Sequence, residues 1–472
     1  MREVMLGQVP LDRLAGLLSS ERVERLEAGV SRAREVFDGR TLWNVNATAT
    51  GGGVAEMLQA LLAYTKGAGI QTRWLVLDGD PGFFTITKRL HNMLHGTAGD
   101  HGVLGGAEQE HYRDVLATNA DSLRELVAPG DVVLLHDPQT AGLAEALRAG
   151  GAQVVWRCHV GADRSNELTE NGWGFLEPHL QAAQAFVFSR RQYAPGWLPP
   201  ERVYVIPPSL DPFSAKNAEM SPADADAALR EAGLVDTAPD HGSLGFVRRD
   251  GSPGVVRPHT GLVLDGAPLP REARIMLQVS RWDRLKDMTG VLRAFAEHVH
   301  DLPKDLHLLL AGPDVSGVSD DPEGAEVLQE CMGLWEELPD PVRRRTHLAT
   351  LPMDDTDENA HLVNALQRRA AVVVQKSLVE GFGLTVTEPM WKSRPVVASR
   401  VGGIQDQVVH GQSGLLLDDP EDLAGFAGLV EQVLADEQLA LALGAGARAR
   451  VQDRFLGDRH LVQYADLFEQ LD

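Results

Sequence analysis

Short apolar runs alternate with amphipathic stretches along most of the chain. The apolar runs end in polar, turn-forming or glycine residues, which is typical of buried strands. Between several of them, apolar residues recur every three or four positions, which indicates helices that each cover a sheet with one face. Repeated alternation of strand and helix predicts parallel sheets of the α/β class.

In the first half of the chain, the pattern predicts a polar, helical lead-in followed by a strand, a glycine loop and a helix at 54–64. Further helices are predicted at 121–127 and 141–148. The predicted strands lie at 41–46, 72–77, 131–136, 153–157, 185–188 and 203–206.

A domain boundary is predicted at the proline-rich segment 207–212, because proline fixes φ and lacks a backbone donor. Residues 221–272 are rich in Asp, Gly and Pro, and we interpret them as one helix at 225–232 followed by an irregular excursion. Helical patterns also dominate from 419 to the end, with a last amphipathic piece at 459–471. Strands of a second sheet are predicted at 273–279, 306–311, 372–375 and 396–399.

The composition of the chain argues against two classes of binding partner. The chain has 472 residues, 43% of them hydrophobic, and a formal net charge of −23, and its length suits two α/β domains. The negative charge opposes extended contact with nucleic acid, which needs many Lys and Arg on one face. No uncharged apolar run approaches the roughly 20 residues that cross a bilayer, so neither nucleic acid nor a membrane is expected as a partner.

The first residues carry charges throughout and lack the order of a secretory signal peptide. The two cysteines, Cys158 and Cys331, are too few for a disulfide framework and lack the paired spacing of a metal site. The acids at 354–357 are interpreted as loop and helix-start residues, so no metal site is predicted. A cytoplasmic protein with reduced thiols is therefore expected.

Ligands of doubly wound sheets bind beyond the carboxyl ends of the strands, and the first such loop contains Gly51, Gly52 and Gly53. Residues without a Cβ let backbone N–H groups approach an anionic ligand at a helix N-terminus. A dinucleotide motif would have a further glycine where Glu56 stands. A tight turn without a ligand therefore remains an equal alternative.

The second loop, 280–287, gathers three cations in an acidic protein. Arg281 and Lys286 can hold the two phosphates of a nucleoside diphosphate, Arg by its planar fork and Lys as a compact charge. The alternative is a solvated helix start in which Asp283 and Asp287 neutralise the bases.

The third loop runs from Glu380 to Glu388 with two glycines between the acids. If a helix begins near Leu384, the glycines free the backbone to bind phosphate, and Glu388 lies about one turn further on. A carboxylate there can accept both vicinal hydroxyls of a ribose, and Glu380 can hold hydroxyls of a transferred sugar. The alternative makes Glu380 a cap and Glu388 an exposed helix residue. His159, directly after the strand at 153–157, can donate to a sugar hydroxyl or be structural.

In this order, the loops resemble the family 4 glycosyltransferases of GT-B architecture, whose hallmark Glu-x7-Glu stands here as Glu380 to Glu388. Four segments are similar, more narrowly, to trehalose glycosyltransferring synthases and retaining trehalose phosphorylases, so that the resemblance covers nearly the whole chain. It implies two Rossmann-like domains with a cleft between them: an acceptor-side domain at 1–208, a nucleotide-sugar-binding domain at 209–450, and a helix at 451–472 that crosses back to the first. The four similar segments are 43–58, 156–159, 278–287 and 374–377.

The resemblance also implies roles for individual residues. Gly52 and Gly53 would line the donor phosphates, His159 would contact the transferred glucose, and Asp163 would contact the acceptor. Arg281 and Lys286 would bind phosphate, Glu380 the glucose hydroxyls and Glu388 the ribose. The rest of the donor loop consists of Gly381, Phe382, Gly383, Leu384 and Thr385.

The implied activity is retaining transfer of glucose from ADP-, UDP- or GDP-glucose to glucose, which forms trehalose reversibly. The implied route is front-face attack with His159, Arg281, Lys286 and Glu380 as catalytic residues. No tightly bound cofactor is expected, although Mg²⁺ can accompany the nucleoside diphosphate, and the family suggests a homodimer. Alternatives are a phosphorylase that uses glucose 1-phosphate, a dinucleotide-dependent oxidoreductase and a non-catalytic sugar-binding protein. The nucleotide base, the acceptor sugar and the physiological direction are not determined by the sequence.

Overall fold

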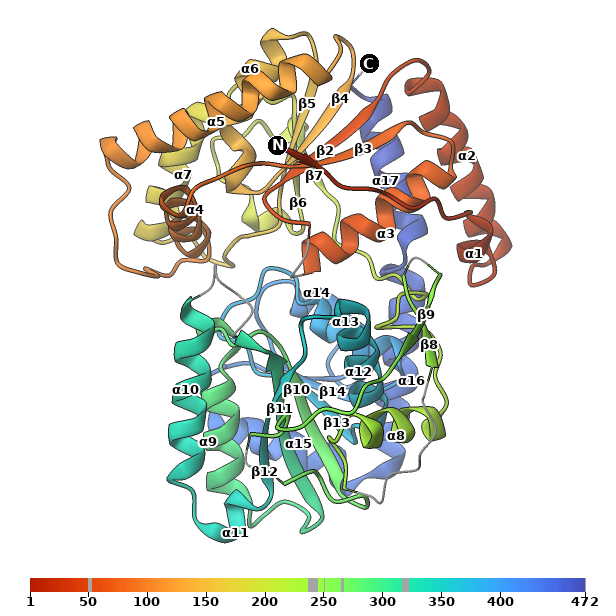
Figure 1. The fold of residues 1–472 in the computed structure, drawn as a ribbon, viewed down its shortest axis with the longest axis vertical. Helices are drawn as coiled ribbons and strands as arrows, with labels where there is room; N and C mark the ends of the chain where they lie inside the picture. The colour runs from red at the N-terminus through yellow and green to blue at the C-terminus, as the bar shows by residue number, and fades with distance from the viewer. Residues whose placement is uncertain (50–52, 237–244, 250, 265–266, 316–321, 472) are drawn as a thin grey trace. The chain divides into compact units, whose positions relative to one another are not determined.

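The chain divides into two compact units in a computed structural model that describes residues 1–49, 53–236, 245–249, 251–264, 267–315 and 322–471. The first unit comprises Met1–Leu210 and Arg454–Asp472, and the second comprises Asp211–Asp453. Each contains a mainly parallel sheet covered by helices, and both sheets are visible in Figure 1.

The sheet of the first unit has the strand order β1-β3-β2-β4-β5-β6-β7. Only β1 runs antiparallel to its neighbour β3, and all other pairs are parallel. Chain order reverses between β2 and β4, so the topological switch point lies beyond the carboxyl ends of these two strands. The strands are β1 (Arg2–Glu3), β2 (Leu42–Asn46), β3 (Thr72–Val76), β4 (Val132–His136), β5 (Gln153–Cys158), β6 (Ala185–Phe188) and β7 (Val203–Val205).

Helices cover both faces of this sheet because alternate strand residues enter two different cores. Val133 and Leu135 of β4 pack into one core with Phe83 and Tyr112, whereas Val132 and Leu134 pack into the other with Phe468. Helices α2 and α17 lie side by side although one is near each end of the chain (Figure 1). The helices are α1 (Asp12–Ala15), α2 (Ser20–Val36), α3 (Gly53–Gly67), α4 (Pro81–Leu94), α5 (Gly106–Leu126), α6 (Ala144–Ala149), α7 (Glu167–Leu180) and α17 (Gly457–Glu469).

The sheet of the second unit is entirely parallel, with the order β12-β11-β10-β13-β14-β15, and β8 pairs with β9 separately. Its switch point lies between β10 and β13, where chain order reverses. The strands are β8 (Gly245–Val247), β9 (Pro253–Val255), β10 (Arg274–Val279), β11 (Leu306–Pro313), β12 (Thr346–Leu351), β13 (Val372–Gln375), β14 (Val396–Ser399) and β15 (Leu415–Leu417).

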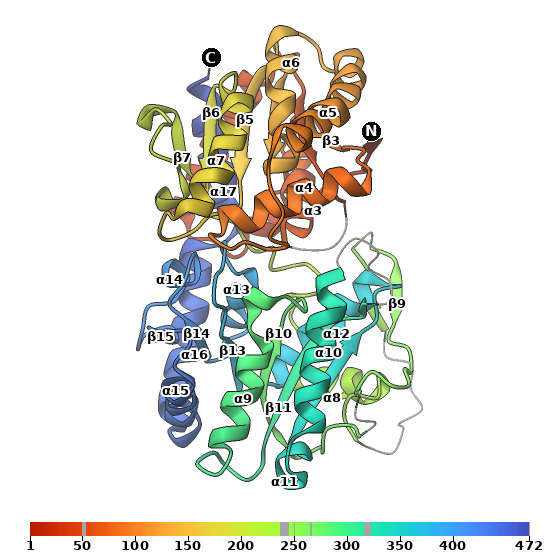
Figure 2. The ribbon, with the colours of Figure 1, turned by 90° about the vertical axis from the view of Figure 1, so that its left-hand side faces the viewer.

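Helices also flank this second sheet, and α9 and α10 lie next to each other in both ribbon views (Figure 2). Phe295 of α9 and Val327 of α10 belong to one core, and Leu362 of α12 belongs to another. The helices are α8 (Pro222–Glu231), α9 (Met288–His298), α10 (Pro322–Glu336), α11 (Asp340–Arg343), α12 (Thr356–Arg369), α13 (Leu384–Trp391), α14 (Ile404–Gln407), α15 (Leu423–Ala435) and α16 (Glu437–Arg454).

Several strand features differ from the sequence-based prediction, among them the short β1 in the predicted helical lead-in. β12 was not predicted because Thr346, His347 and Thr350 interrupt its apolar pattern, yet pairing with β11 completes the sheet. β15 was missed because it has only three residues. Part of the predicted irregular excursion forms the β8–β9 pair. An ion pair between Arg248 and Asp355 connects this pair to the start of α12.

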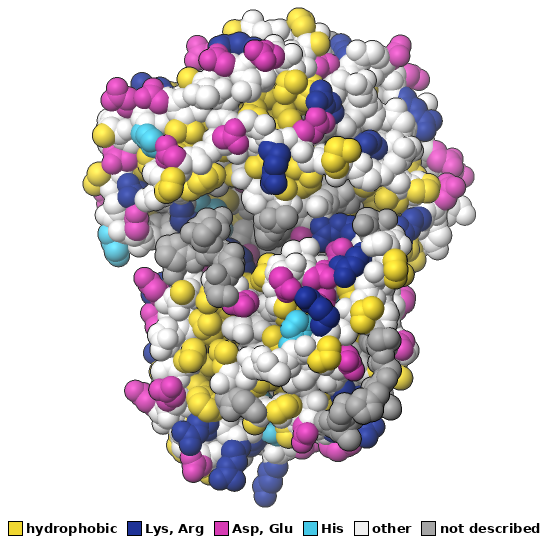
Figure 3. All heavy atoms as spheres, viewed as in Figure 1, with side chains coloured by type: hydrophobic (Ala, Val, Ile, Leu, Met, Phe, Trp, Pro, Cys, Tyr) yellow, Lys and Arg dark blue, Asp and Glu magenta, His cyan; other side chains and the backbone are white. Residues whose placement is uncertain are grey.

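Acidic and basic side chains are intermixed on the face shown in Figure 3. Within the described ranges, no helix is long and apolar enough to cross a bilayer. In the same part of the chain, no group of three or more His, Cys, Asp or Glu side chains is arranged to hold a metal ion.

Candidate active site

The second and third predicted loops meet at the switch point of the second unit. The loop after β10 carries Arg281 and Lys286, and the loop after β13 carries Glu380. β10 and β13 are adjacent in the sheet, and the backbone N–H of Leu378 donates to the carbonyl of Leu285 at 2.8 Å. Residues that are far apart in the chain therefore form one site.

Lys286 and Glu380 form an ion pair at the centre of this site. The Lys286 Nζ lies 2.5 Å from the Glu380 Oε2, and the two side chains are 15% and 8% exposed. Ser377 also donates to the same carboxylate oxygen, at 3.4 Å. The pair holds one cation and one carboxylate at the place where a sugar phosphate would offer an anion and hydroxyl groups.

The three cations of the loop after β10 have three different partners. Arg281 pairs with Asp283 at 3.1 Å and keeps a half-exposed side chain. Arg284 instead pairs with Glu326 and Glu330 of α10. Asp287 does not neutralise a base of its own loop, because it caps α9 through the Gly290 N–H and pairs with the buried Lys376. Arg281 and Lys286 are thus the two cations of this loop at the switch point.

The glycine-rich loop takes the backbone shape that a helix start at Leu384 requires. Gly383 has φ of +86° and directly precedes α13, and φ in this left-handed region favours glycine. The amide of Gln407 donates to the carbonyls of Phe382 and Gly383, which fixes the loop. At the helix start, the buried Thr385 hydroxyl has no hydrogen-bond partner among the described residues.

Glu388 is a buried helix residue, not an exposed one. Its Oε2 accepts from the Gln367 amide at 3.1 Å, and its Oε1 lies 3.7 Å from the Lys216 Nζ. Lys392, which directly follows α13, donates to the Gln367 Oε1 at 2.6 Å. Burial lowers the pKa of Lys392 to about 7, although the Glu388 charge acts in the opposite direction.

His159 lies at the carboxyl end of β5 in the first unit, as predicted, but its ring is already engaged. Nδ1 lies 3.0 Å from the Asp137 carboxylate, and Nε2 accepts from the Arg157 Nε at 2.6 Å. In this arrangement the ring has no N–H left for a sugar hydroxyl, so the predicted donor role is not available to it. Local spacing does not show the Asp137 contact, because Asp137 follows a different strand.

Asp137 is held tightly at the switch point of the first unit. It follows β4 with φ of +65°, which is uncommon for a residue with a side chain, and accepts from the His159 backbone N–H at 2.7 Å. Burial alone would raise the pKa of this carboxyl, but the contacts with His159 outweigh burial and lower the pKa to about 2. Asp137 is therefore an ionised carboxylate.

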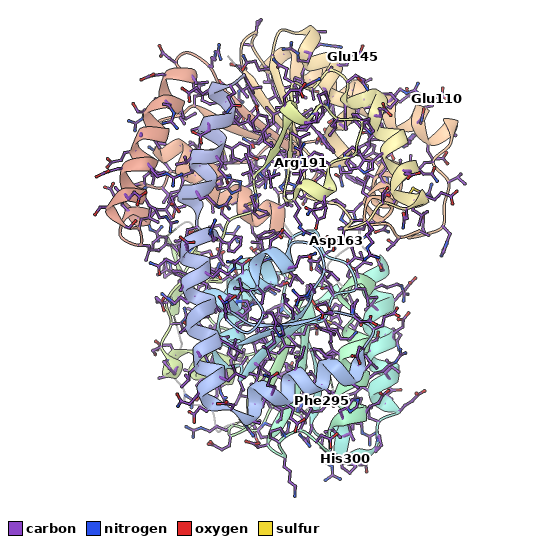
Figure 4. The ribbon with its side chains drawn as sticks, turned by 180° about the vertical axis from the view of Figure 1, so that it is seen from behind. Glu110, Glu145, Asp163, Arg191, Phe295 and His300 are labelled. Atoms are coloured by element: carbon purple, nitrogen blue, oxygen red, sulfur yellow. The ribbon has the colours of Figure 1, made fainter. Side chains whose placement is uncertain are left out.

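Three other residues of the first unit were predicted to belong to the site. Asp163 lies on the loop between β5 and α7 and pairs with Arg190 (Figure 4). Gly53 is the exposed first residue of α3, and Gly52 lies outside the described residues.

Four residues at these sites were missed from the sequence. Asp137 directly follows a predicted strand, so the rule that ligands bind at strand ends would have found it. Lys216 and Gln367 carry no local pattern, because only the fold brings them to Glu388. Arg157 is two residues before His159, so strand alternation would have placed both side chains on one face.

Two family models match this chain. The model described as "Trehalose synthase, N-terminal domain" matches residues 44–195, and the model described as "Glycosyl transferases group 1" matches residues 356–450. These ranges include His159 and Asp163 in the first unit and the Glu380–Glu388 segment in the second.

The chain is similar over its whole length to trehalose synthases, and over part of their length to trehalose phosphorylases. Trehalose synthase from Rubrobacter xylanophilus is 33% identical over 100% of this chain and 99% of the relative. A trehalose phosphorylase from Pleurotus pulmonarius is 26% identical over 86% of this chain but only 54% of its own length.

The solved structure of Anabaena Alr3699/HepE in complex with UDP and glucose has a similar fold. Its TM-score is 0.59 at 15% identity, over 91% of this chain and 100% of the other. This likeness concerns the fold, and with the other structural neighbours it confirms the predicted GT-B architecture of two Rossmann-like α/β sheets.

Proposed function

The chain belongs to the trehalose synthase family of GT-B glycosyltransferases, and on that basis we propose that it transfers glucose from a nucleoside diphosphate glucose to glucose with retention of configuration. It is a hexosyltransferase of trehalose metabolism. The nucleotide donor, the free glucose acceptor and the reversible formation of trehalose are the parts that we propose.

The ion pair of Lys286 and Glu380 is the observation that carries this proposal. It stands at the switch point of the second unit, next to Arg281 and to the start of α13. Arg281 and Lys286 would take the charge of the diphosphate, and Glu380 would accept hydroxyls of the glucose. Glu388, which accepts a hydrogen bond from the Gln367 amide, would hold the ribose hydroxyls.

The proposed reaction proceeds on one face of the sugar. The bond between glucose C1 and the phosphate oxygen breaks while a bond from the acceptor hydroxyl oxygen to C1 forms on the same face. The proton of that hydroxyl passes to the leaving phosphate, and the products are a nucleoside diphosphate and trehalose. Lys286 and Arg281 stabilise the charge that develops on the phosphate, which lowers the barrier to cleavage. No residue acts as a covalent nucleophile in this route.

The first unit would supply the acceptor side. We assign His159 to the neighbourhood of the transferred glucose and Asp163 to the acceptor, with Asp137 as an additional carboxylate at the same strand ends. Gly52 and Gly53 would line the donor phosphates from this unit. The boundaries 1–208, 209–450 and 451–472, the cytoplasmic location and the homodimer stay predictions.

A phosphorylase that uses glucose 1-phosphate is the second candidate, because trehalose phosphorylases are among the relatives. In that reaction Arg281 and Lys286 would bind a single phosphate and Glu388 would have no ribose. The ligands of Anabaena HepE, UDP and glucose, support a nucleotide donor.

Product analysis by NMR tests the two candidates directly. The protein is incubated with glucose and, separately, with ADP-glucose, UDP-glucose, GDP-glucose or glucose 1-phosphate, each with Mg²⁺ and with a chelator. We expect α,α-linked trehalose from at least one nucleotide donor. Trehalose formed from glucose 1-phosphate alone would show that the protein is a phosphorylase. An inverted linkage would contradict the front-face route. No product from any donor would contradict the proposed activity.

A further inference from the structure

Arg157 is a buried cation in the first unit that no step of the proposed reaction uses. It is the fifth residue of β5, its side chain is fully buried, and its neighbour His159 belongs to the proposed site. Within the described residues, no carboxylate contacts its guanidinium group. A buried charge without a carboxylate partner costs folding free energy, so its position calls for a functional explanation.

The contacts of Arg157 are all uncharged acceptors. Its Nε donates to the His159 Nε2 at 2.6 Å, and its Nη2 donates to the Ile206 carbonyl at 3.0 Å. Its Nη1 lies 3.3 Å from the His460 Nε2 and donates to the Tyr464 hydroxyl. Each histidine must therefore present a lone pair on Nε2, because an arginine N–H can only donate.

These contacts fix the protonation of His159. With Nε2 occupied by the Arg157 N–H, the ring hydrogen lies on Nδ1, where it points to the ionised Asp137. Arg157 and Asp137 thus hold opposite sides of one uncharged imidazole. Without Arg157, the nearby carboxylate would favour a second proton on the ring and thereby an imidazolium.

Helix α17 holds the other end of Arg157. His460 and Tyr464 are one turn apart on this helix, their rings stack at 5.2 Å between centroids, and both are buried. The Nδ1 of His460 lies 2.8 Å from the Ser209 hydroxyl, which leaves its Nε2 free to accept from Arg157. The C-terminal helix is in this way connected to His159 through a single side chain.

We propose that Arg157 is a positioning residue that keeps His159 as the uncharged Nδ1–H tautomer, and that His460 and Tyr464 of α17 hold Arg157 in place. This rests on the proposed function, in which His159 lies near the transferred glucose. Because that sugar gains positive charge as its C1–O bond breaks, an imidazolium beside it would oppose the reaction. With Arg157 in place, the positive charge lies on its guanidinium group and not on the His159 ring.

Several titratable or charged groups lie around the His159 ring, where they can influence its pKa. His136 is the last residue of β4 and Asp137 follows it, Arg157 comes from β5, and His460 comes from α17. Burial lowers the pKa of His159, the Asp137 charge raises it, and the Arg157 charge lowers it further. Removal of Arg157 should therefore raise this pKa.

The test is an NMR titration of ring-labelled histidine in the full-length protein, with the His159 signals assigned from a His159→Gln variant. In the wild type we expect an uncharged ring with hydrogen on Nδ1 at pH 7. In Arg157→Met the His159 pKa should rise by about one unit or more. The acidic limb of the pH profile of kcat for trehalose formation should move upward by a similar amount. Tyr464→Phe should move both in the same direction by less.

Arg202→Met is the matched control, because the hydrogen bonds of Arg202 to described residues go to the backbone carbonyls of Ala183 and Gln184. It should leave the His159 titration unchanged. An imidazolium or an Nε2–H tautomer in the wild type would overturn the proposal even if Arg157→Met does not fold. An unchanged titration in folded Arg157→Met would overturn it as well. Because the titration needs no substrate, it still decides the matter if the protein makes no trehalose, which would contradict only the proposed function.

Discussion

Lys286 and Glu380 lie 94 residues apart in the chain, and their side chains meet at 2.5 Å at the switch point of the second sheet. Each was predicted to bind a different part of one donor, Lys286 the phosphate and Glu380 the sugar hydroxyls. Their contact places those two functions side by side, as a sugar phosphate requires.

Replacement of Lys286 by alanine tests the proposed phosphate ligand. We expect kcat to fall roughly 10²- to 10³-fold, because one electrostatic donor to the transition state contributes about 2.7–4 kcal/mol. Steady-state kinetics measure the loss, and calorimetry should find the melting temperature nearly unchanged. Arg284→Ala is the control, since Arg284 pairs with acids of α10. Equal losses in both variants would mean that the charge of the loop, and not Lys286, matters.

Glu388→Gln tests the proposed ribose contact. Hydrogen bonds to a charged group contribute about 1.5–3 kcal/mol, so KM for the nucleotide donor should rise roughly 10- to 100-fold with a smaller change in kcat. Initial-rate measurements over a range of donor concentrations give both constants. Glu431→Gln, an exposed residue of α15, should change neither. A KM equal to that of the wild type would remove the ribose role from Glu388.

The left-handed backbone of Gly383 predicts that Gly383→Ala is harmful. A Cβ at φ of +86° costs about 1–2 kcal/mol, and it would lie 3.1 Å from the Glu380 Cγ. Calorimetry should show a lower melting temperature, and donor binding should weaken. Gly428→Ala in α15 should instead be neutral or stabilising by up to about 1 kcal/mol, because nothing lies within 4 Å of the added Cβ. The same sign for both would contradict the strain at Gly383.

Buried histidines of the first unit predict a loss of stability in acid. Burial lowers the pKa of His136, His159 and His460 below the ordinary histidine value of 6.5. The unfolded chain then binds more protons than the folded one as pH falls below about 6.5, so stability decreases by about 1.4 kcal/mol per pH unit for each histidine. This loss continues down to the pKa of the folded state.

Denaturant unfolding followed between pH 7.5 and 5 measures that dependence, with the range chosen around about 6.5. His136→Gln should make it shallower, because one of the buried rings no longer titrates. His300→Gln should leave it unchanged, because His300 is exposed (Figure 4). A stability that does not depend on pH in this range would show that the three rings are not buried as uncharged imidazoles.

The sequence by itself determined the α/β class, most strands, and the loops that carry the proposed chemistry. It did so because side-chain periodicity and glycine placement are local properties, as the helix start at Leu384 illustrates. β12 was not predicted, because its polar residues interrupt the apolar pattern and the strand is stabilised by pairing with β11.

Tertiary structure alone decided which side chains meet. The adjacency of β10 and β13 brings Lys286 to Glu380, and the fold brings Gln367 and Lys216 to Glu388. It also brings Asp137 to the Nδ1 of His159, a residue that the sequence had left free to donate. Local spacing does not contain this information, because contacts between distant residues depend on strand order and on how helices pack over the sheet.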